Sequence, residues 1–471
     1  MVTIWIILVV YMLINLAIGF YSGKKIKNSS DYLLAGRNIG VLLTAGTLAA
    51  TEVGGGSTVG VAAKAYGSWG LSAGWYVTAA GIGVILVSFI APMLRRSMAT
   101  TMPEIIERRF GNSSHIITLI LSLSANIALA GVQITASATI ISVLTGLSTN
   151  WGILLSGIVL VFYTMIGGMW SVTLTDIVHA IVLLAGFTIA VPFAIHNAGG
   201  WNHVVGALPQ GQLGFTKVGW KTIIGLIIMY FMTFSTGQEC VQRLFAAKDE
   251  KTAVKGSMLC GILMALYSFI PAILGLVALA VFPHINPNNA IATVSTNLIP
   301  HLIAGLVMAA VISATLSSGS GDLLGASTVF VKDIYQHYIN PKVSDEHLMH
   351  YSKTAVLVFG IIAICISLFS KQIIPMLVFA FTMRSAGPFA AFIFGLTWKN
   401  VTKHAGILSI ILGSIAGFWW QYLNEPFGIM AVIVGSVVSV ITFIIVFVNR
   451  KGLRPSFNTI AYFTEIDIVE F

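Results

Sequence analysis

The sequence predicts an all-α membrane protein that crosses the bilayer many times. Of its 471 residues, 57% are hydrophobic and only 9% are charged, whereas about a quarter of the residues in an ordinary soluble domain are charged. The mean hydropathy is +0.92. Apolar segments of about 20 residues recur along the chain, and this length spans the hydrocarbon core of a bilayer as a helix. These observations argue against a soluble domain.

Thirteen segments fit membrane-spanning helices, with boundaries defined to about three residues. In chain order they are 3–22, 41–65, 71–94, 114–146, 151–167, 173–195, 220–241, 257–282, 296–330, 353–370, 373–397, 404–422 and 427–448. The first segment has no basic residues before its apolar run, and its positive charges follow that run. It is therefore expected to be an uncleaved helix rather than a signal peptide.

The lysine and arginine residues predict the orientation of these helices. Twenty of the 25 fall in loops that the alternation of spans places on one side. This group comprises Lys24, Lys25, Lys27, Arg37, Arg95, Arg96, Arg108, Arg109, Arg243, Lys248, Lys251, Lys255, Lys332, Lys342, Lys353, Lys399, Lys403, Arg450, Lys451 and Arg454. Because such residues accumulate in cytoplasmic loops, the N-terminus is expected outside and the C-terminus inside. This orientation explains the net charge of +9 without a nucleic-acid partner. The charge is also compatible with attraction to anionic lipid.

Two apolar helices are predicted to be broken near the middle of the membrane. The stretch AATEVGGGSTVG, 49–60, places Glu52 about 18 Å from the cytoplasmic end of its span, followed by three glycines that permit a break. The stretch FSTGQECVQR, 234–243, interrupts a second helix five spans later. Two interrupted helices in corresponding halves of a chain are typical of an inverted-repeat transporter.

Two further stretches carry polar groups at membrane depth. In AAVISATLSSGSGDLLGAS, 309–327, Ser313, Ser317 and Ser320 share one helix face, and close helix packing explains such small residues equally well. Asp176 and His179 lie one turn apart in another span, and an aspartate at this depth points to function. Single, unpaired cysteines are expected to be packing residues; they are Cys240, Cys260 and Cys365.

Taken together, these motifs resemble the sodium:solute symporter family over essentially the whole chain. The matching stretches are DYLLAGR at 31–37, the break after Glu52, TMPEIIERRFG at 101–111, GGMWSVTLTD at 167–176, QRLFAAKDEKTA at 242–253 and ATLSSGSGDLLGASTVFVKDIY at 314–335. The resemblance implies a LeuT-type core of two inverted five-helix repeats, with broken first and sixth core helices.

The resemblance also implies how the chain is divided. Residues 1–40 would form an additional N-terminal helix and the first cytoplasmic loop, and 41–397 the ten-helix transport core. Two C-terminal helices would follow in 398–449, and 450–471 would be a short cytoplasmic tail.

By motif alignment, the resemblance implies a sodium site between the first and eighth core helices. Three ligands would be backbone carbonyl groups, those of Ala50, Val53 and Ala314. The other two would be the side-chain hydroxyl groups of Ser317 and Ser318. Carbonyl and hydroxyl oxygens suit a small hard cation. A second cation site would use Asp176, Ser317 and Ser320, but Gly321 stands where the family has a further serine. Asp322 lies on another face of the helix and is expected to contact a neighbouring helix.

The expected substrate cavity or gate comprises Glu52, Ser57, Gly74, Gly237, Gln238 and Arg384. The glycine-rich break is most similar to the choline-transporter branch, but that branch has tryptophans at positions 52 and 237, so no aromatic cage for a quaternary ammonium is expected here. Ser57, Gly74 and Gly237 offer too few hydrogen bonds for a sugar. Proline-type members have an aspartate at the Glu52 position.

Arg384 is the one basic residue predicted within a span, at a depth similar to that of Glu52. Opposite charges at the midplane tend to find each other or a ligand. Three readings are open: a structural or gating ion pair between Glu52 and Arg384, a contact of Arg384 with a substrate carboxylate, and an Arg384 side chain turned into an aqueous vestibule.

The sequence therefore predicts a sodium-coupled symporter of the plasma membrane that imports a small organic solute by alternating access. An amino acid, a monocarboxylate or a similar anion or zwitterion is the favoured substrate. We expect no cofactor apart from the coupling sodium ion and no obligate protein partner. We also expect no enzymatic activity, because Asp176 and His179 alone are too few groups for a catalytic site. A proton-coupled symporter and a sensor that binds solute without transport are the alternatives.

Overall fold

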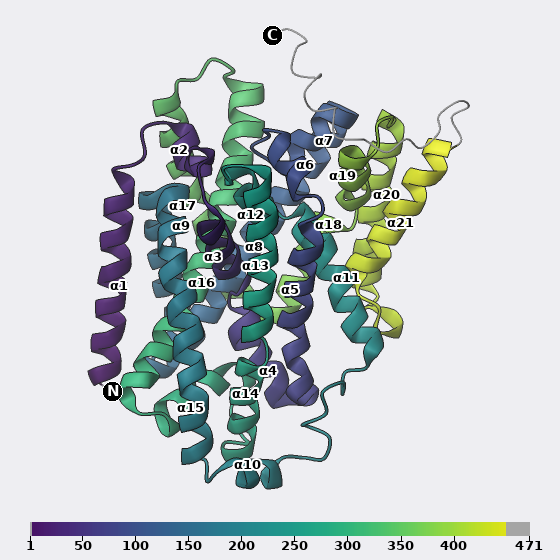
Figure 1. Ribbon diagram of the computed structural model, residues 1–471. Helices are drawn as coiled ribbons and strands as arrows, with labels where there is room; N and C mark the ends of the chain where they lie inside the picture. Colours follow the sequence, from purple (N-terminus) through teal and green to yellow (C-terminus); the bar gives the residue numbers. More distant parts are fainter. Residues whose placement is uncertain (1, 449–471) are drawn as a thin grey trace.

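The computed structural model describes residues 2–448, and nearly all of this part of the chain is helical (Figure 1). Within it no β-strand is present, and one isolated bridge joins Ile39 to Ala247. The prediction of an all-α protein is confirmed. The predicted cytoplasmic tail, 450–471, including Arg450, Lys451 and Arg454, lies outside the described residues.

The first half of the described chain contains α1 to α10. Their bounds are α1 Val2–Gly23, α2 Ser29–Leu34, α3 Val41–Glu52, α4 Val61–Lys64, α5 Trp75–Val87, α6 Ala91–Arg96, α7 Met102–Phe110, α8 Asn112–Thr145, α9 Thr149–Asn197 and α10 Trp201–Ala207. Shorter 3-10 and π-helical turns join them at Ala35–Arg37, Gly56–Gly60, Ala65–Trp69 and Gly70–Gly74.

The second half contains α11 to α21. Their bounds are α11 Trp220–Thr236, α12 Gln238–Ala246, α13 Glu250–Tyr267, α14 Ile270–Val281, α15 Ala290–Leu298, α16 His301–Val329, α17 Asp345–Phe369, α18 Ile373–Ser385, α19 Pro388–Thr397, α20 Lys403–Tyr422 and α21 Ala431–Val448. The shorter turns here are Pro287–Asn289, Phe330–Ile339 and Pro426–Gly428.

Each predicted span overlaps a helix, but the helices are divided differently. By length and apolar composition, nine helices in the described residues could cross a membrane, or up to eleven if each of two bent pairs forms one span. The difference from thirteen has two sources. Helix α9 joins the predicted spans 151–167 and 173–195, and the break in 41–65 leaves α3 too short to count alone. The count of thirteen stays a prediction.

Gly168 divides the long helix α9 at the junction of its two predicted spans. Its φ of 51° and ψ of −164° are non-helical and are accessible essentially only to glycine. A Cβ atom there would also lie 2.6 Å from Cδ2 and 2.8 Å from the carbonyl oxygen of Tyr32. The two halves of α9 can therefore take different directions while α2 packs against the break.

Both predicted helix interruptions are present. Helix α3 ends at Glu52, and the chain resumes as a π-helical turn, Gly56–Gly60, before α4. Helices α11 and α12 meet at an angle of 59° around Gly237. A further bend of 48°, which the sequence does not predict, separates α18 from α19. The N–H and C=O groups that lose their helical partners at such breaks must form hydrogen bonds with other protein groups or with water in a cavity.

Helix α16 lies at the centre of the molecule and packs most extensively against α8 and α9 (Figure 1). Most of its residues are buried, including every residue from Ser313 to Val329. The many small side chains in this part of α16 allow neighbouring helices to approach closely. The centre of the fold is therefore a helix whose hydroxyl groups face other helices rather than lipid.

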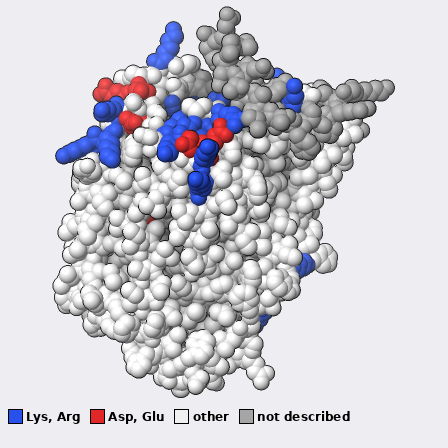
Figure 2. Space-filling model, in the orientation of Figure 1, with Lys and Arg blue, Asp and Glu red and all other residues white. Residues whose placement is uncertain are grey.

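The outer surface suits a lipid environment. Large apolar side chains point outward from the peripheral helices, such as Ile6 and Leu13 on α1 and Ile181 on α9, each more than 50% exposed. Figure 2 shows Lys, Arg, Asp and Glu gathered towards one end of the visible face, with a broad region of other residues below them. An apolar surface of this extent marks a contact with membrane.

Loops that the sequence places in the cytoplasm meet at this charged end. Arg37 donates hydrogen bonds to the carbonyl oxygens of Met98 and Ala99 at 2.7 and 3.0 Å, and Arg96 forms an ion pair with Glu250 at 2.6 Å. Helix α1 begins at the opposite end (Figure 1). Three loops assigned to one side therefore lie together.

Arg243 is an exception to the predicted loop assignment. The sequence places it in a cytoplasmic loop, but it lies inside α12 and is only 1% exposed. The reason is that the chain continues as a helix to Ala246 after the break at Gly237. The prediction for Arg243 is therefore wrong.

Replacing Gly168 by alanine should destabilise the protein by about 1–3 kcal/mol from backbone strain alone, and the contact with Tyr32 should add to this. Thermal unfolding of the purified protein in detergent measures the effect. Gly225→Ala in α11 is the control, because its Cβ would meet only Ile433, at 3.6 Å. Equal melting temperatures for the two variants would contradict the assigned role of Gly168.

Candidate functional site

The break after α3 brings backbone groups against α16. Val53 leaves the helix with φ −91° and ψ 66°, and the Gly55 amide donates to Gln133 Oε1 at 2.7 Å. A Cβ at Gly54 would lie 2.7 Å from the same Gln133 oxygen and closer still to Ser318 Oγ. Glycine is thus needed so that this segment can approach α8 and α16 closely. From the sequence, these glycines are explained only by the backbone conformations that they permit.

Four of the five predicted sodium ligands, Ala50, Val53, Ala314 and Ser318, lie at this approach, whereas the Ser317 hydroxyl donates to Asp176. Ser318 Oγ lies 2.5 Å from the carbonyl oxygen of Thr51 and 3.4 Å from that of Ala50, while Ala50, Val53 and Ala314 line one cavity. The Ser318 hydroxyl thus lies on two carbonyl oxygens that the helix break leaves without a partner in α3. The donor types fit a sodium ion.

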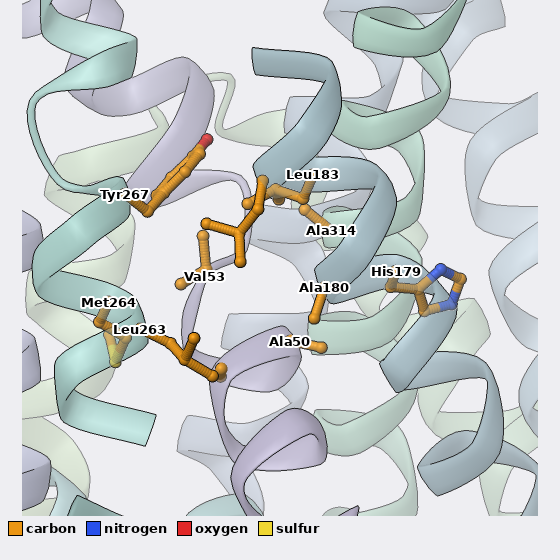
Figure 3. A pocket seen from close by; sticks show the side chains of 11 residues that line it. Ala50, Val53, His179, Ala180, Leu183, Leu263, Met264, Tyr267 and Ala314 are labelled. Atoms are coloured by element: carbon orange, nitrogen blue, oxygen red, sulfur yellow. The ribbon is translucent and has the colours of Figure 1, made fainter. Parts of the chain in front are cut away.

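This cavity lies between α3, α9, α13 and α16, and its volume of about 20 Å³ is room for a ligand of about the size of one water molecule. Figure 3 shows the side chains of Val53, Leu183 and Leu263 facing one another across it, while the His179 ring points away. Most of the side chains that line it are apolar. Solutes larger than an ion or water do not fit in this arrangement.

Asp176 is fully buried and lies beside Ser317, one of the predicted sodium ligands. Its Oδ1 accepts a hydrogen bond from Ser317 at 2.5 Å, and its Oδ2 accepts one from Thr47 at 2.5 Å. Arg243 Nη2 is 3.7 Å from the same Oδ2. Of the predicted second cation site, Asp176 and Ser317 are therefore in contact, whereas the Ser320 hydroxyl donates to the carbonyl oxygen of Ser317 at 2.9 Å.

His179 belongs to a separate polar cluster with Tyr11 and Ser313. Tyr11 bonds His179 Nδ1 and donates to Ser313 Oγ, the latter at 2.5 Å; Ser313 Oγ also bonds His179 Nδ1. The cluster fastens α1 to α9 and α16. Ser313 is thus used in a packing contact, and Tyr11 was missed because nothing in the apolar first helix marks it.

The buried arginine of α18 is paired with Glu239 rather than with Glu52. Arg384 Nη1 donates to Glu239 Oε1, and both side chains are almost fully buried. The reading of a Glu52–Arg384 ion pair is therefore wrong. The reason is the break at Gly237, which sets Glu239 in the first turn of α12, facing α18; the residue is visible in FSTGQECVQR, but its direction depends on the bend.

Gly237 explains why this pair can form. A Cβ there would lie 2.7 Å from Glu239 Oε1 and 2.8 Å from Arg384 Cζ. The choline-transporter branch, as the resemblance implies, has a tryptophan at this position. Here the ion pair occupies the space that a large ring would need, so an aromatic cage and the Arg384–Glu239 pair are mutually exclusive.

Polar atoms around this pair have no partner. They are Glu52 Oε1, Glu239 Oε2, Arg384 Nε and Arg384 Nη2, all buried and without a hydrogen bond. Charged atoms that are buried without a hydrogen bond are costly, and each of them calls for an explanation, such as a water molecule or an ion bound there. The arrangement presents both a negative and a positive group between α3, α12 and α18.

The other predicted cavity residues have structural contacts. Ser57 Oγ donates to the Glu52 carbonyl oxygen at 3.0 Å, and Gly74 packs so closely on Phe269 that a side chain would not fit. Gln238 accepts from the Met102 amide at 2.9 Å and is fully buried. Its side-chain amide joins α12 to the start of α7.

The helical fold with two broken helices facing a central hydroxyl-rich helix defines a secondary transporter of the membrane. A family model described as the sodium:solute symporter family matches residues 32–413. The chain belongs to the sodium:solute symporter family. Its members are symporters rather than enzymes, and sodium is the coupling ion.

Comparisons with known proteins agree with this assignment. A sodium/proline symporter of Staphylococcus aureus is 27% identical over 443 residues, covering 87% of this chain and 84% of that protein. The solved structure of a Na⁺-coupled sialic acid symporter, in a substrate-bound outward-open state, has a TM-score of 0.82 at 21% identity and covers 94% of this chain and 97% of that one.

More distant structures share the architecture. MhsT in complex with L-phenylalanine has a TM-score of 0.51 at 11% identity, covering 86% of this chain and 98% of that one. These structural likenesses confirm the LeuT-type fold. The chain is an integral membrane protein.

Removing one partner of the Arg384–Glu239 pair should destabilise the protein by about 3–5 kcal/mol, because the other charge is left buried. The double variant Arg384→Gln/Glu239→Gln should lose much less than the sum of the single variants. Thermal unfolding in detergent measures all three, with Lys342→Gln, an exposed lysine, as control. Additive losses would show that the two side chains do not interact.

Proposed function

We propose that this symporter imports a zwitterionic amino acid across the plasma membrane together with sodium. The observation that carries the proposal is the set of unpartnered buried atoms of both signs: Arg384 Nε and Nη2 on one side, and Glu52 Oε1 on the other. A solute with a carboxylate and an ammonium group would satisfy both. A monocarboxylate, the other class favoured by the sequence, would leave Glu52 Oε1 without a hydrogen bond, which is costly at this depth.

Alternating access would follow from the contact between α3 and α16. Sodium held by Ala50, Val53, Ala314, Ser317 and Ser318 would join the two helices and stabilise an outward-open state. Solute binding would then close the outer gate, and release of sodium to the cytoplasm would open the inner one. Because each ligand favours the joined arrangement, the effect of sodium on solute affinity equals the effect of solute on sodium affinity.

The proposed orientation places the N-terminus outside and the C-terminus inside. It is supported by the excess of Lys and Arg in alternate loops and by the contacts among three of these loops at the charged end. The sodium/proline symporter relative supports an amino acid as the substrate class.

Counterflow in proteoliposomes tests the substrate class. A panel of labelled amino acids, monocarboxylates and vitamins is offered with and without sodium, and we expect exchange of amino acids that requires sodium. Exchange of monocarboxylates alone would contradict the zwitterion assignment. Uptake driven by a proton gradient without sodium would favour the proton-coupled alternative, and specific binding without flux would favour a sensor.

Arg384→Gln and Glu52→Gln should each raise the KM for the transported amino acid by about 10- to 100-fold, because each removes a charged hydrogen-bond partner worth about 1.5–3 kcal/mol. Initial uptake rates at a fixed sodium gradient give this value, after surface expression is equalised. Lys342→Gln is the control. Unchanged substrate affinity in Arg384→Gln would exclude a contact with the substrate carboxylate.

Ser318→Ala should raise the sodium concentration for half-maximal uptake by about tenfold or more, equivalent to at least ~1.4 kcal/mol, because one of five proposed oxygen ligands is lost. Ser327→Ala is the matched control on the same helix, since its hydroxyl donates to the Ser352 carbonyl oxygen at 2.8 Å. The same sodium dependence in both variants would remove Ser318 from the site.

A further inference from the structure

Arg243 is a buried arginine that the transport mechanism described above does not use. It is 1% exposed, and its Nη1 donates to the Glu239 carbonyl oxygen at 2.7 Å while Nε donates to Thr47 Oγ1 at 3.0 Å. Its Nη2 makes no hydrogen bond and lies 3.7 Å from Asp176 Oδ2. A buried guanidinium needs a counter-charge, and Asp176 supplies it.

Asp176 is the residue around which a second cation site was expected. Among the described residues, Arg243 is its only basic partner within ion-pair distance. The carboxylate also accepts hydrogen bonds from Thr47 and Ser317. Both of its oxygens are therefore engaged, and a permanent positive charge already lies beside it.

The space that holds this guanidinium depends on Gly321. A Cβ at this position would lie 3.0 Å from Nη2 and 3.3 Å from Nη1 of Arg243, and 3.2 Å from Thr51 Cγ2. A serine here, which the family resemblance leads one to expect, would crowd the guanidinium. The same missing side chain thus removes an oxygen ligand for a second cation and makes room for the arginine.

The remaining hydroxyl of the expected site also faces elsewhere. Ser320 Oγ donates to the Ser317 carbonyl oxygen within α16. A second sodium ion would have Ser317 and one carboxylate, with a guanidinium next to it, whereas small hard cations are held by several oxygens. The chemistry at Asp176 is therefore that of a closed ion pair.

We propose that Arg243 is a tethered cation that takes the place of a second sodium ion at Asp176, so that the protein binds one sodium ion per transport cycle. This inference rests on the proposed sodium site at Ala50 and Ser318. The arginine carries the balancing charge permanently, and the stoichiometry is set by the pair of residues Arg243 and Gly321.

Counting sodium ions on the purified full-length protein tests the inference without knowledge of the substrate. Equilibrium binding of radioactive ²²Na⁺ in detergent should give one site per chain and a Hill coefficient of about 1. Asp176→Asn should leave the count at one. Ser318→Ala should weaken all sodium binding by tenfold or more, and Ser327→Ala should leave it unchanged.

The double variant Arg243→Ala/Gly321→Ser should acquire a second sodium ion, because it removes the tethered charge and restores a hydroxyl. Arg243→Lys, which retains the charge, should still bind one sodium ion.

Two sodium ions on the unmodified protein, or a count that Asp176→Asn reduces from two to one, would overturn the inference while leaving sodium coupling intact. Absence of any sodium binding would instead overturn the proposed function, and the inference with it. The counts on the unmodified protein and on Asp176→Asn decide the question even where the double variant does not fold.

Discussion

The contact between the broken end of α3 and the hydroxyl face of α16 is the interaction on which the rest of the site depends. At membrane depth there is no bulk water to satisfy the carbonyl groups that the break frees. Ser318 covers those of Ala50 and Thr51, and the three glycines permit the approach. The atoms that the break leaves to be satisfied by this one hydroxyl are thus among those proposed to bind sodium.

Two buried arginines that form ion pairs, Arg243 and Arg384, each lie against a glycine. Arg384 is paired with Glu239, and a Cβ at Gly237 would lie 2.8 Å from its Cζ; Arg243 is paired with Asp176, and a Cβ at Gly321 would lie 3.0 Å from its Nη2. The family resemblance implies larger side chains at both positions in other members, a tryptophan at 237 in one branch and a serine at 321. A guanidinium is long and planar, so the absence of a side chain on the facing helix is what admits it to a closely packed core.

Much of this architecture follows from local sequence signals. Apolar length identifies the helices, and glycines beside a buried carboxylate identify the breaks at Glu52 and Gly237. Pairings across the fold are different, because they depend on the angle at which the chain leaves each break. Arg243 reads as a loop residue beside a lysine-rich segment, and Glu239 reads as one polar residue among several. Only the 59° bend after α11 turns Glu239 towards α18 and Arg243 towards α9.

The two ion pairs leave Glu52 without an ion-pair partner of its own among the described residues, and this asymmetry would connect the proposed sodium site to the proposed solute site. Glu52 lies between Ala50 and Val53 in the chain, so the proposed sodium ligands and the proposed solute contact share one segment at the end of α3. Glu52 is also within electrostatic reach of Glu239 and Arg384, as is the buried Asp322. Sodium would therefore offset negative charge at the place where the ammonium of a solute is proposed to bind, while joining the helices that enclose it. Repulsion between the sodium ion and the ammonium group of the solute would by itself oppose their simultaneous binding. Positive coupling between sodium and solute must then come from closing α3 onto α16, because only that rearrangement improves both sites at once.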